Sequence, residues 1–225
     1  MDIGFIGLGK MGMPMAHHLL DSDYTLHIYN RTQSKCVEFV KKGALSMSTP
    51  ALLASSVDVV ILMVTDDDAV KSIIFGENGI VNDKNFNCKV IIDHSTISPD
   101  CSLSMHQQLK EIGISYLDAP VSGAPVGARK AELTTYVGGE KETFELVKDI
   151  ISQYSDKIHY MGDAGKGQAT KVCNQVMVLN TMLSACEALK LAKLQGLDIH
   201  KLLSAFRGNL FDSKIWRIYT ESTFL

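Results

Sequence analysis

A glycine-rich loop between a short apolar segment and an amphipathic helix opens the chain and limits what it can fold into. Residues 2–6 predict a strand, and the six residues that follow have the pattern Gly-x-Gly-x-x-Gly. Gly7 permits a tight turn, Gly9 lets the backbone approach a phosphate, and Gly12 lets helix and strand pack closely. The helix start offers unpaired N–H groups to that phosphate. The sequence therefore predicts a dinucleotide-binding loop, made of Gly7, Leu8, Gly9, Lys10, Met11 and Gly12.

The end of the next predicted strand, residues 25–29, indicates which dinucleotide binds. It lies close to the spacing of about 20 residues at which the adenosine ribose is read. An acidic residue there selects NAD, but this chain has Asn30, Arg31 and Thr32. A guanidinium binds a 2′-phosphate, and no carboxylate repels it. We therefore predict NADP, with NAD as the second choice. A glycine turn without nucleotide and a solvated arginine remain open as alternatives.

Composition excludes several other classes of protein. The 225 residues carry a net charge of −3, and no cluster of Lys and Arg predicts binding to nucleic acid. The five cysteines are odd in number and form no Cys-x-x-Cys pair, which favours reduced thiols and a cytoplasmic location. The start of the chain does not resemble a signal peptide, and no apolar run is long enough to span a bilayer. We expect neither a nucleic-acid nor a membrane partner.

Short apolar segments alternate with amphipathic helical stretches as far as about Tyr160. This alternation is typical of an α/β fold with a doubly wound, mainly parallel sheet of the Rossmann type. After the first two strands, we predict strands at residues 57–64, 90–93, 115–119, 133–137 and 157–160.

The composition of the chain changes after Gly162. Residues 165–194 contain no proline and no glycine beyond Gly167, so we predict one helix of about 28 residues, or about 40 Å. Shorter helices are expected at 198–207 and 212–219. We thus predict a dinucleotide-binding domain over residues 1–162 and a partial, all-helical domain over 163–225. Apolar residues on several sides of the long helix predict a homo-oligomer that covers them.

Ligands of parallel sheets bind beyond the carboxyl ends of the strands, so the segments there are candidates for the site. Asp66, Asp67 and Asp68 suit a helix start better than a metal, and we predict no metal site. The hydroxyls of residues 93–99 suit a ribose or a nicotinamide amide, or a helix cap before Pro99. In residues 118–128, two prolines and two glycines predict a loop whose N–H groups bind a carboxylate.

The most specific feature is the segment Gly165-Lys166-Gly167-Gln168-Ala169-Thr170-Lys171-Val172-Cys173-Asn174. Lys171 and Asn174 are three residues apart and share one face of the long helix. A lysine near a helix N-terminus opposes the helix dipole, so a partner or a chemical role explains it better than helix stability does. A solvated surface lysine is the alternative.

Four segments together resemble the β-hydroxyacid dehydrogenases, a family related to 3-hydroxyisobutyrate dehydrogenase. They are the N-terminal glycine pattern, residues 93–99, residues 118–128, and the Gly-x-Gly-x-x-x-Lys-x-x-Asn pattern that begins at Gly165. Asn30, Arg31 and Thr32 resemble the branch of glyoxylate and succinic semialdehyde reductases. The resemblance implies that Lys171 is the catalytic acid/base. It places Ser122, Gly123 and Asn174 at the substrate, Thr96 at the nicotinamide, and Met63, Val64 and Asp68 along the cofactor groove.

The resemblance implies an NADPH-linked oxidoreductase that interconverts a small carboxylated aldehyde, such as glyoxylate or succinic semialdehyde, and its hydroxyacid. The chain departs from the family at Ala124 and Gln175, where glycine and asparagine are usual. It also ends inside the helical domain, before helices that carry another cofactor-side lysine and much of the subunit interface. The alternative is therefore a truncated or non-catalytic nucleotide-binding scaffold. Lys171 favours the enzyme, because the scaffold relatives have lost that lysine.

Overall fold

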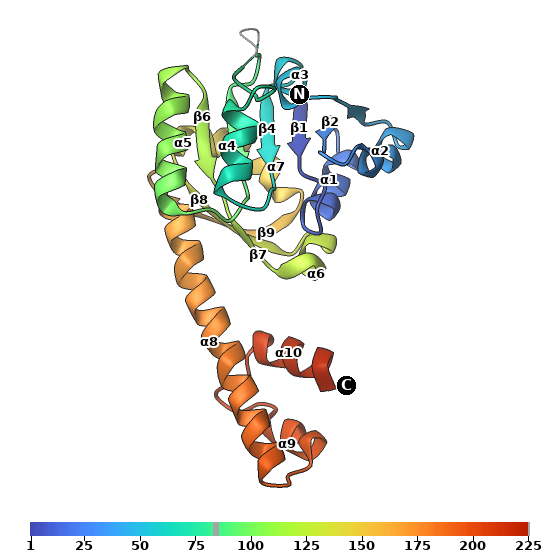
Figure 1. Ribbon diagram of the computed structural model, residues 1–225, viewed down its shortest axis with the longest axis vertical. Helices are drawn as coiled ribbons and strands as arrows, with labels where there is room; N and C mark the ends of the chain where they lie inside the picture. The colour runs from blue at the N-terminus through green and yellow to red at the C-terminus, as the bar shows by residue number, and fades with distance from the viewer. Residues whose placement is uncertain (83–85, 225) are drawn as a thin grey trace. The chain divides into compact units, whose positions relative to one another are not determined.

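The structure is a computed structural model that describes residues 1–82 and 86–224 (Figure 1). The chain forms two compact units, Met1–Lys171 and Val172–Leu225. One long helix, α8 (Lys166–Leu194), contributes its first turns to the first unit and the rest to the second. The domain boundary expected after residue 162 stays a prediction.

The first unit contains a sheet with helices between most of its strands. The strands are β1 (Asp2–Ile6), β2 (Thr25–Tyr29), β3 (Leu45–Ser46), β4 (Val59–Leu62), β5 (Val90–Asp93), β6 (Ser115–Asp118), β7 (Val121–Ser122), β8 (Leu133–Gly138) and β9 (Ser155–Gly162). The helices are α1 (Gly12–Leu20), the 3-10 helix η1 (Gln33–Cys36), α2 (Val37–Lys41), α3 (Pro50–Ser55), α4 (Asp67–Phe75), α5 (Pro99–Glu111), α6 (Ala124–Arg129) and α7 (Lys141–Ser152).

The strand order is β3-β2-β1-β4-β5-β6-β8-β7, and β9, which lies off this path, also pairs with β8. The strands from β3 to β6 are parallel to their neighbours, whereas β8 is antiparallel to β6 and β7. The predicted doubly wound, mainly parallel sheet is confirmed. The order reverses between β1 and β4, and ligands of such sheets bind where the carboxyl ends of these two strands separate.

The sheet is buried on both faces. Successive side chains of a strand point to opposite sides, and strand β4 shows that both sides are covered. In β4, Val59 and Ile61 belong to the hydrophobic cluster formed with α1 and α7. Val60 and Leu62 belong to the cluster formed with α3, α4 and α5. All four are at most 3% exposed. Helices accordingly cover both faces (Figure 1), and the strand ends are held in fixed positions.

The predicted strand bounds agree with the structure for β1, β2 and β5, while the strand expected at 57–64 is shorter. It ends at Leu62, and the Val64 N–H donates to the Ser95 hydroxyl (3.0 Å) instead of a neighbouring strand. The short strands β3 and β7 were not predicted. Two residues are too few to show an alternating pattern.

The loop expected over residues 118–128 is the main correction to the predicted fold. Val121 and Ser122 pair with β8 as strand β7, and α6 begins immediately after Gly123. Pro125 lies in the first turn of α6, where the missing N–H of a proline removes no hydrogen bond. Most of the prolines and glycines that predicted an irregular loop thus lie at the ends of short regular elements, whereas Gly127 lies inside α6.

The second unit consists of residues 172–194 of α8 followed by α9 (Ile199–Phe206) and α10 (Lys214–Phe224). The three predicted helices are confirmed, with bounds shifted by a few residues. Ala185, Leu189 and Trp216 form its buried cluster, and partly buried residues of α9 pack against them. Among the helices described, none is long and apolar enough to cross a membrane.

Candidate cofactor and active site

The glycine loop after β1 has a backbone that only glycine accommodates. Gly7 has a φ of 105°, in the left-handed region that favours glycine. A Cβ atom there would collide with the carbonyl of Met63 at the end of β4, and one at Gly12 would collide with the carbonyl of Gly7. The loop is therefore packed against β4 and against the start of α1, as the pattern predicts.

The backbone of this loop is arranged to receive an anion. Among the described residues, the N–H groups of Gly9, Lys10 and Met11 donate no hydrogen bond. The N–H of Leu8 donates to Oδ1 of Asn30 (2.9 Å), which fixes the loop to the end of β2. Free N–H groups before a helix suit a pyrophosphate, so these residues fit a dinucleotide.

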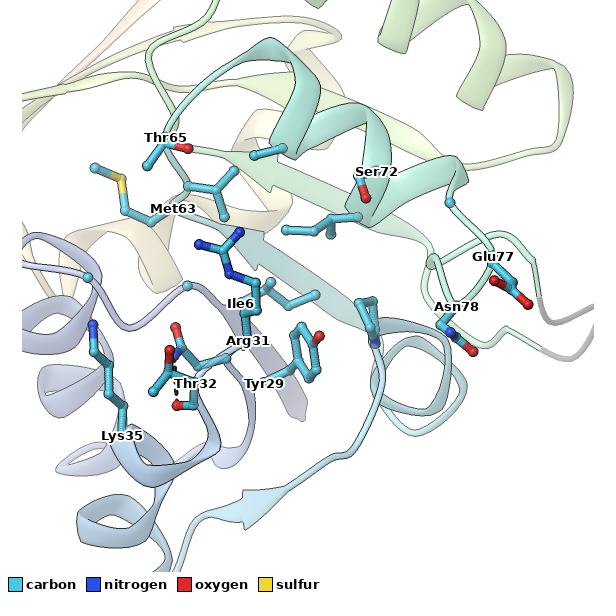
Figure 2. A pocket seen from close by; sticks show the side chains of 18 residues that line it. Ile6, Tyr29, Arg31, Thr32, Lys35, Met63, Thr65, Ser72, Glu77 and Asn78 are labelled. Carbon is cyan, nitrogen blue, oxygen red and sulfur yellow. Dashed lines mark hydrogen bonds between the residues drawn. The ribbon is translucent and has the colours of Figure 1, made fainter.

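A cavity of about 520 Å³ opens beside the glycine loop, between the ends of β2 and β4 and helix α4 (Figure 2). Its size lies within the usual range for small-molecule and cofactor sites. Seven residues of the predicted site line it: Gly7, Gly9, Asn30, Arg31, Thr32, Met63 and Val64. The sequence therefore identified most of the wall formed by the strand ends.

Several lining residues were not predicted, and Lys35 is the most informative. It lies in η1, four residues after Arg31, and its side chain comes from the same side of the cavity as Arg31 and Thr32 (Figure 2). The prediction stopped at the strand end. A lysine one turn beyond Arg31 was the signal for it. The other unpredicted residues are Ile6, Tyr29, Pro50, Thr65, Ala69, Ser72, Ile73, Gly76, Glu77 and Asn78.

Six predicted cofactor residues do not line this cavity. Leu8 is fully buried in the core, and Gly12 serves close packing. Asp68 is exposed in the first turn of α4, which Asp66 caps by accepting the N–H of Ala69 (2.9 Å). The three consecutive acids are thus a helix start, and no group of three or more metal-binding side chains lies together in the part of the chain described. The others are Lys10, Met11 and Thr96.

The segment after β5 exposes Thr96 and uses the hydroxyls on either side of it internally. Ser95 accepts the N–H of Val64. Ser98 caps α5 by accepting the N–H of Cys101 (3.1 Å), and its hydroxyl donates to Asp67 (2.6 Å). The predicted helix cap is thus confirmed for Ser98, whereas a contact of the exposed Thr96 with a ligand stays a prediction.

Two buried titratable groups hold the end of β5. Asp93 is fully buried, accepting the Tyr116 hydroxyl (2.7 Å) and the Ser95 N–H (2.8 Å). Burial raises the pKa of Asp93 to about 6. The ring nitrogens of His94 lie 2.6 Å from the Ala119 carbonyl oxygen and 2.7 Å from the Tyr154 hydroxyl, and burial lowers the pKa of His94 to about 4. Both side chains hydrogen-bond within the protein, so they support the site.

Lys171 is a buried cation at the start of α8. Only 8% of the residue is exposed, which excludes the solvated surface lysine. Its Nζ donates to the carbonyl of Val121 in β7 (2.8 Å), which brings the amine beside the segment that carries Ser122 and Gly123. Burial lowers the pKa of this amine from its usual 10.5. An amine of this kind can exchange a proton with a bound molecule.

The segment next to Lys171 has an unusual backbone. Ser122 is half-buried, and Gly123 has a φ of 140°. Ala124 follows with a φ of 56°, a conformation that favours glycine. This explains why glycine suits the position better than the alanine of this chain. Asn174 lies in α8, half-buried, within the second unit.

Comparison with known proteins agrees with these features. A family model described as the NAD binding domain of 6-phosphogluconate dehydrogenase matches residues 2–162. A second, described as NAD-binding of NADP-dependent 3-hydroxyisobutyrate dehydrogenase, matches residues 165–222.

Individual relatives are similar over most of this chain. An uncharacterised oxidoreductase of Bacillus subtilis is 38% identical over 90% of the chain and 70% of its own length. The 2-hydroxy-3-oxopropionate reductase of Escherichia coli is 36% identical over 98% of the chain and 75% of its own length. The solved structure of Psf3 in complex with NADP⁺ and 2-OPP has a TM-score of 0.88 at 25% identity. The alignment covers 98% of this chain and 78% of that one.

Proposed function

Because the chain belongs to the β-hydroxyacid dehydrogenase family of NAD(P)-dependent oxidoreductases, we propose that it is an NADPH-linked reductase of small carboxylated aldehydes. The reverse reaction would oxidise the corresponding hydroxyacids. The observation that carries the proposal is the buried Lys171, whose amine bonds to the backbone one residue before Ser122. A scaffold that only binds nucleotide has no use for such an amine.

In this proposal, Lys171 acts as the general acid. NADPH, when bound, supplies the hydride that reduces the carbonyl carbon. The protonated amine of Lys171 hydrogen-bonds to the carbonyl oxygen, stabilises the negative charge that develops there, and gives it a proton to form the alcohol. The neutral amine then regains a proton from solvent. The lowered pKa of Lys171 brings its proton affinity nearer to neutral pH, which favours this exchange.

We assign the substrate carboxylate to Ser122 and Gly123, and the substrate role of Asn174 stays a prediction. Ser122 and Gly123 adjoin the carbonyl that Lys171 contacts, so a carboxylate held there would present the neighbouring carbonyl group to the amine. Fixing two reacting groups in this way lowers the barrier by supplying their orientation in advance. The E. coli relative's name, 2-hydroxy-3-oxopropionate reductase, describes a substrate with both a carboxylate and an aldehyde. This supports the same substrate class here, with glyoxylate and succinic semialdehyde as candidates.

We propose NADP as the preferred cofactor, with NAD second. Arg31 and Lys35 both line the cavity near the end of β2. An NAD-binding chain would have an acidic residue at the position of Asn30. The side chain of Asn30 bridges the Leu8 N–H and the Thr32 carbonyl. It therefore shapes the cavity without adding a charge that would repel a 2′-phosphate. Met63 and Val64 line this cavity, and we propose that Thr96 and Asp68, which do not line it, also contact the cofactor.

A turnover panel tests this proposal. Glyoxylate, succinic semialdehyde, methylmalonate semialdehyde and tartronate semialdehyde are each offered with NADPH and with NADH. We expect turnover of at least one aldehyde with NADPH, at a higher kcat/KM than with NADH. NADPH binding without turnover of any aldehyde would contradict the enzyme and favour the scaffold.

We propose that the chain acts as a homo-oligomer. Val172, Val176, Leu179 and Leu183 recur at helical spacing along α8, and each is about half exposed or more. An apolar stripe of this kind usually marks an interface. Sedimentation at micromolar concentration should show a dimer or larger species, and a compact monomer would contradict this. The cytoplasmic location stays a prediction from the reduced thiols.

A further inference from the structure

A buried carboxylate ties the start of α8 to the end of β6. Asp118 is fully buried, and its two carboxylate oxygens accept the N–H groups of Gly165 and Gln168, each at 2.8 Å. These N–H groups belong to the start of the helix, where backbone donors have no partner within the helix. The first turn of α8 is thereby fixed to the sheet.

Gly167 lets this turn pack closely against the sheet. A Cβ atom at Gly167 would collide with the carbonyl oxygens of Asp118 and Tyr136. The helix backbone thus lies in direct contact with β6 and β8. The position of this turn is defined by backbone packing as well as by the hydrogen bonds of Asp118.

The side chain of Gln168 reaches in another direction, to the segment after β5. It is 1% exposed. Its Nε2 donates to the Ser95 carbonyl (2.7 Å), and its Oε1 accepts the Ile97 N–H (3.3 Å). These two partners lie on either side of the exposed Thr96. One amide therefore holds the backbone on both sides of the residue assigned to the nicotinamide end.

We infer that Gln168 is a positioning residue that fixes Thr96 relative to Lys171. Lys171 follows Gln168 by three residues in the same helix, and its amine is held at Val121. The clamp of Gln168 and Asp118 therefore joins the two segments between which hydride and proton must be delivered to one carbonyl group. This inference rests on the proposed function for the roles of Thr96 and Lys171, whereas the clamp itself rests on the geometry.

The chemistry of the clamp requires one donor and one acceptor on the same side chain. Glutamine supplies both. In Gln168→Glu, an ionised carboxylate still accepts from Ile97 but repels the Ser95 carbonyl oxygen. A protonated carboxyl donates to Ser95 and accepts from Ile97, so it reproduces the amide. Gln168→Glu should therefore work at low pH and fail at high pH, while Gln168→Leu fails at every pH.

Steady-state kinetics across pH test the inference. We expect Gln168→Leu to lower kcat by about 10- to 100-fold, because small misplacements of reacting groups have effects of this size. NADPH affinity should change by less than about twofold, since the phosphate and ribose contacts lie elsewhere. In Gln168→Glu, kcat relative to the parent should rise as pH falls. Asp93 and Asp118 also titrate near this side chain, and the ratio to the parent removes their common contribution.

Gln153→Leu is the matched control, because Gln153 also donates its side-chain amide to a backbone carbonyl, that of Asp149 at the end of α7. It should leave kcat and its pH profile unchanged. Thermal melting separates loss of folded protein from loss of rate. Either of two results would overturn the inference. One is a kcat of Gln168→Leu equal to that of the parent, and the other is a ratio of the kcat of Gln168→Glu to the parent's that does not vary with pH.

A second measurement keeps the inference independent of the proposed function. If the parent turns over no aldehyde, the proposed function fails, and the pKa of Lys171 can still be followed by NMR after reductive ¹³C-methylation. A clamp that holds the first turn of α8 keeps the amine buried. Gln168→Leu should then move this pKa upward, toward 10.5. An unchanged pKa would overturn the positioning role.

Discussion

The two units of this chain bury their apolar residues to very different extents. In the first, strand β4 is at most 3% exposed, because helices cover both faces of the sheet. In the second, Leu179 and Leu183 are 59% and 57% exposed, and the buried cluster is centred on Ala185, Leu189 and Trp216. A sheet covered on both faces contains its own core, whereas three helices bury only the sides that meet. The first unit should therefore be stable by itself, and the second should depend on further contacts.

Replacing one leucine in each unit should give the largest difference in the free energy of unfolding. Leu62→Ala removes a side chain that is 0% exposed and should lower the free energy of unfolding by about 2 to 5 kcal/mol. Leu183→Ala removes an exposed side chain and should change it by less than about 0.5 kcal/mol. Urea unfolding followed by circular dichroism measures both. Equal losses would show that Leu183 is covered in solution, as an oligomer requires.

Cofactor binding should also stabilise the two units to different extents, because every proposed phosphate and ribose contact lies in the first unit. Trp216, the sole tryptophan, reports on the second unit. NADP⁺ at about 100 times its Kd should stabilise the first unit by about 2.7 kcal/mol. The circular dichroism transition should then shift to higher urea, while the fluorescence transition shifts less. Equal shifts would contradict independent units.

Arg31→Ala tests the cofactor preference of the first unit. A charge-assisted bond to the 2′-phosphate contributes about 1.5 to 3 kcal/mol, or roughly ten- to a hundredfold in affinity. The substitution should remove most of the advantage of NADP⁺ over NAD⁺ and leave NAD⁺ binding nearly unchanged. Calorimetric titration of both cofactors measures this. Tighter binding of NAD⁺ by the parent would refute the cofactor preference, and Lys35→Ala would show whether the second cation shares the phosphate.

The buried carboxyl of Asp93 makes the first unit sensitive to pH. Its pKa is about 6 in the folded chain and 3.8 as the ordinary value, so the unfolded chain releases this proton first as pH rises. The protonated Asp93 carboxyl contributes fully to the free energy of unfolding below about pH 3.8. This contribution is lost as pH rises through about 6, and it is of order 1 to 3 kcal/mol. Urea unfolding of parent and Asp93→Asn from pH 4 to 7 should show their difference falling with pH. A constant difference would contradict the raised pKa. His94 contributes with the opposite sign, but equally to both proteins.

The smallest expected effect compares helix caps, one in each unit. Asp66 accepts the N–H of Ala69 at the start of α4, and Asp198 accepts those of His200 and Lys201 at the start of α9. Alanine at either position should destabilise its own unit by about 1 kcal/mol. Asp66→Ala should move the circular dichroism transition, and Asp198→Ala the Trp216 fluorescence transition. If each variant moved both transitions equally, the chain would unfold as one body.

The parts of the fold that could be predicted from the sequence are those with a local cause. The turn at Gly7, the apolar strand β4 and the long helix α8 each follow from a pattern within a few consecutive residues. Strand β7 could not be predicted, because its two residues pair with β8 through contacts distant in sequence.

The candidate site follows the same rule. Arg31 and Lys171 could be proposed from the sequence because each belongs to a short motif. Lys35 lines the same cavity but lies beyond the end of β2, outside the motif that contains Arg31. Gln168 carried no signal, because its partners Ser95 and Ile97 are 73 and 71 residues away. Such a contact becomes visible only when the sheet brings the segments together.

The proposed reductase mechanism depends on Lys171, and turnover of Lys171 variants measures that dependence. Lys171→Ala should lower kcat on the best aldehyde by about 10² to 10⁴, the usual range for a positioned proton donor. Lys171→Arg should not restore it, because a guanidinium does not release a proton near neutral pH. Lys166→Ala, an exposed lysine in the same helix, is the matched control and should turn over like the parent. Equal turnover by the parent and a folded Lys171→Ala would contradict the claim that Lys171 is the general acid.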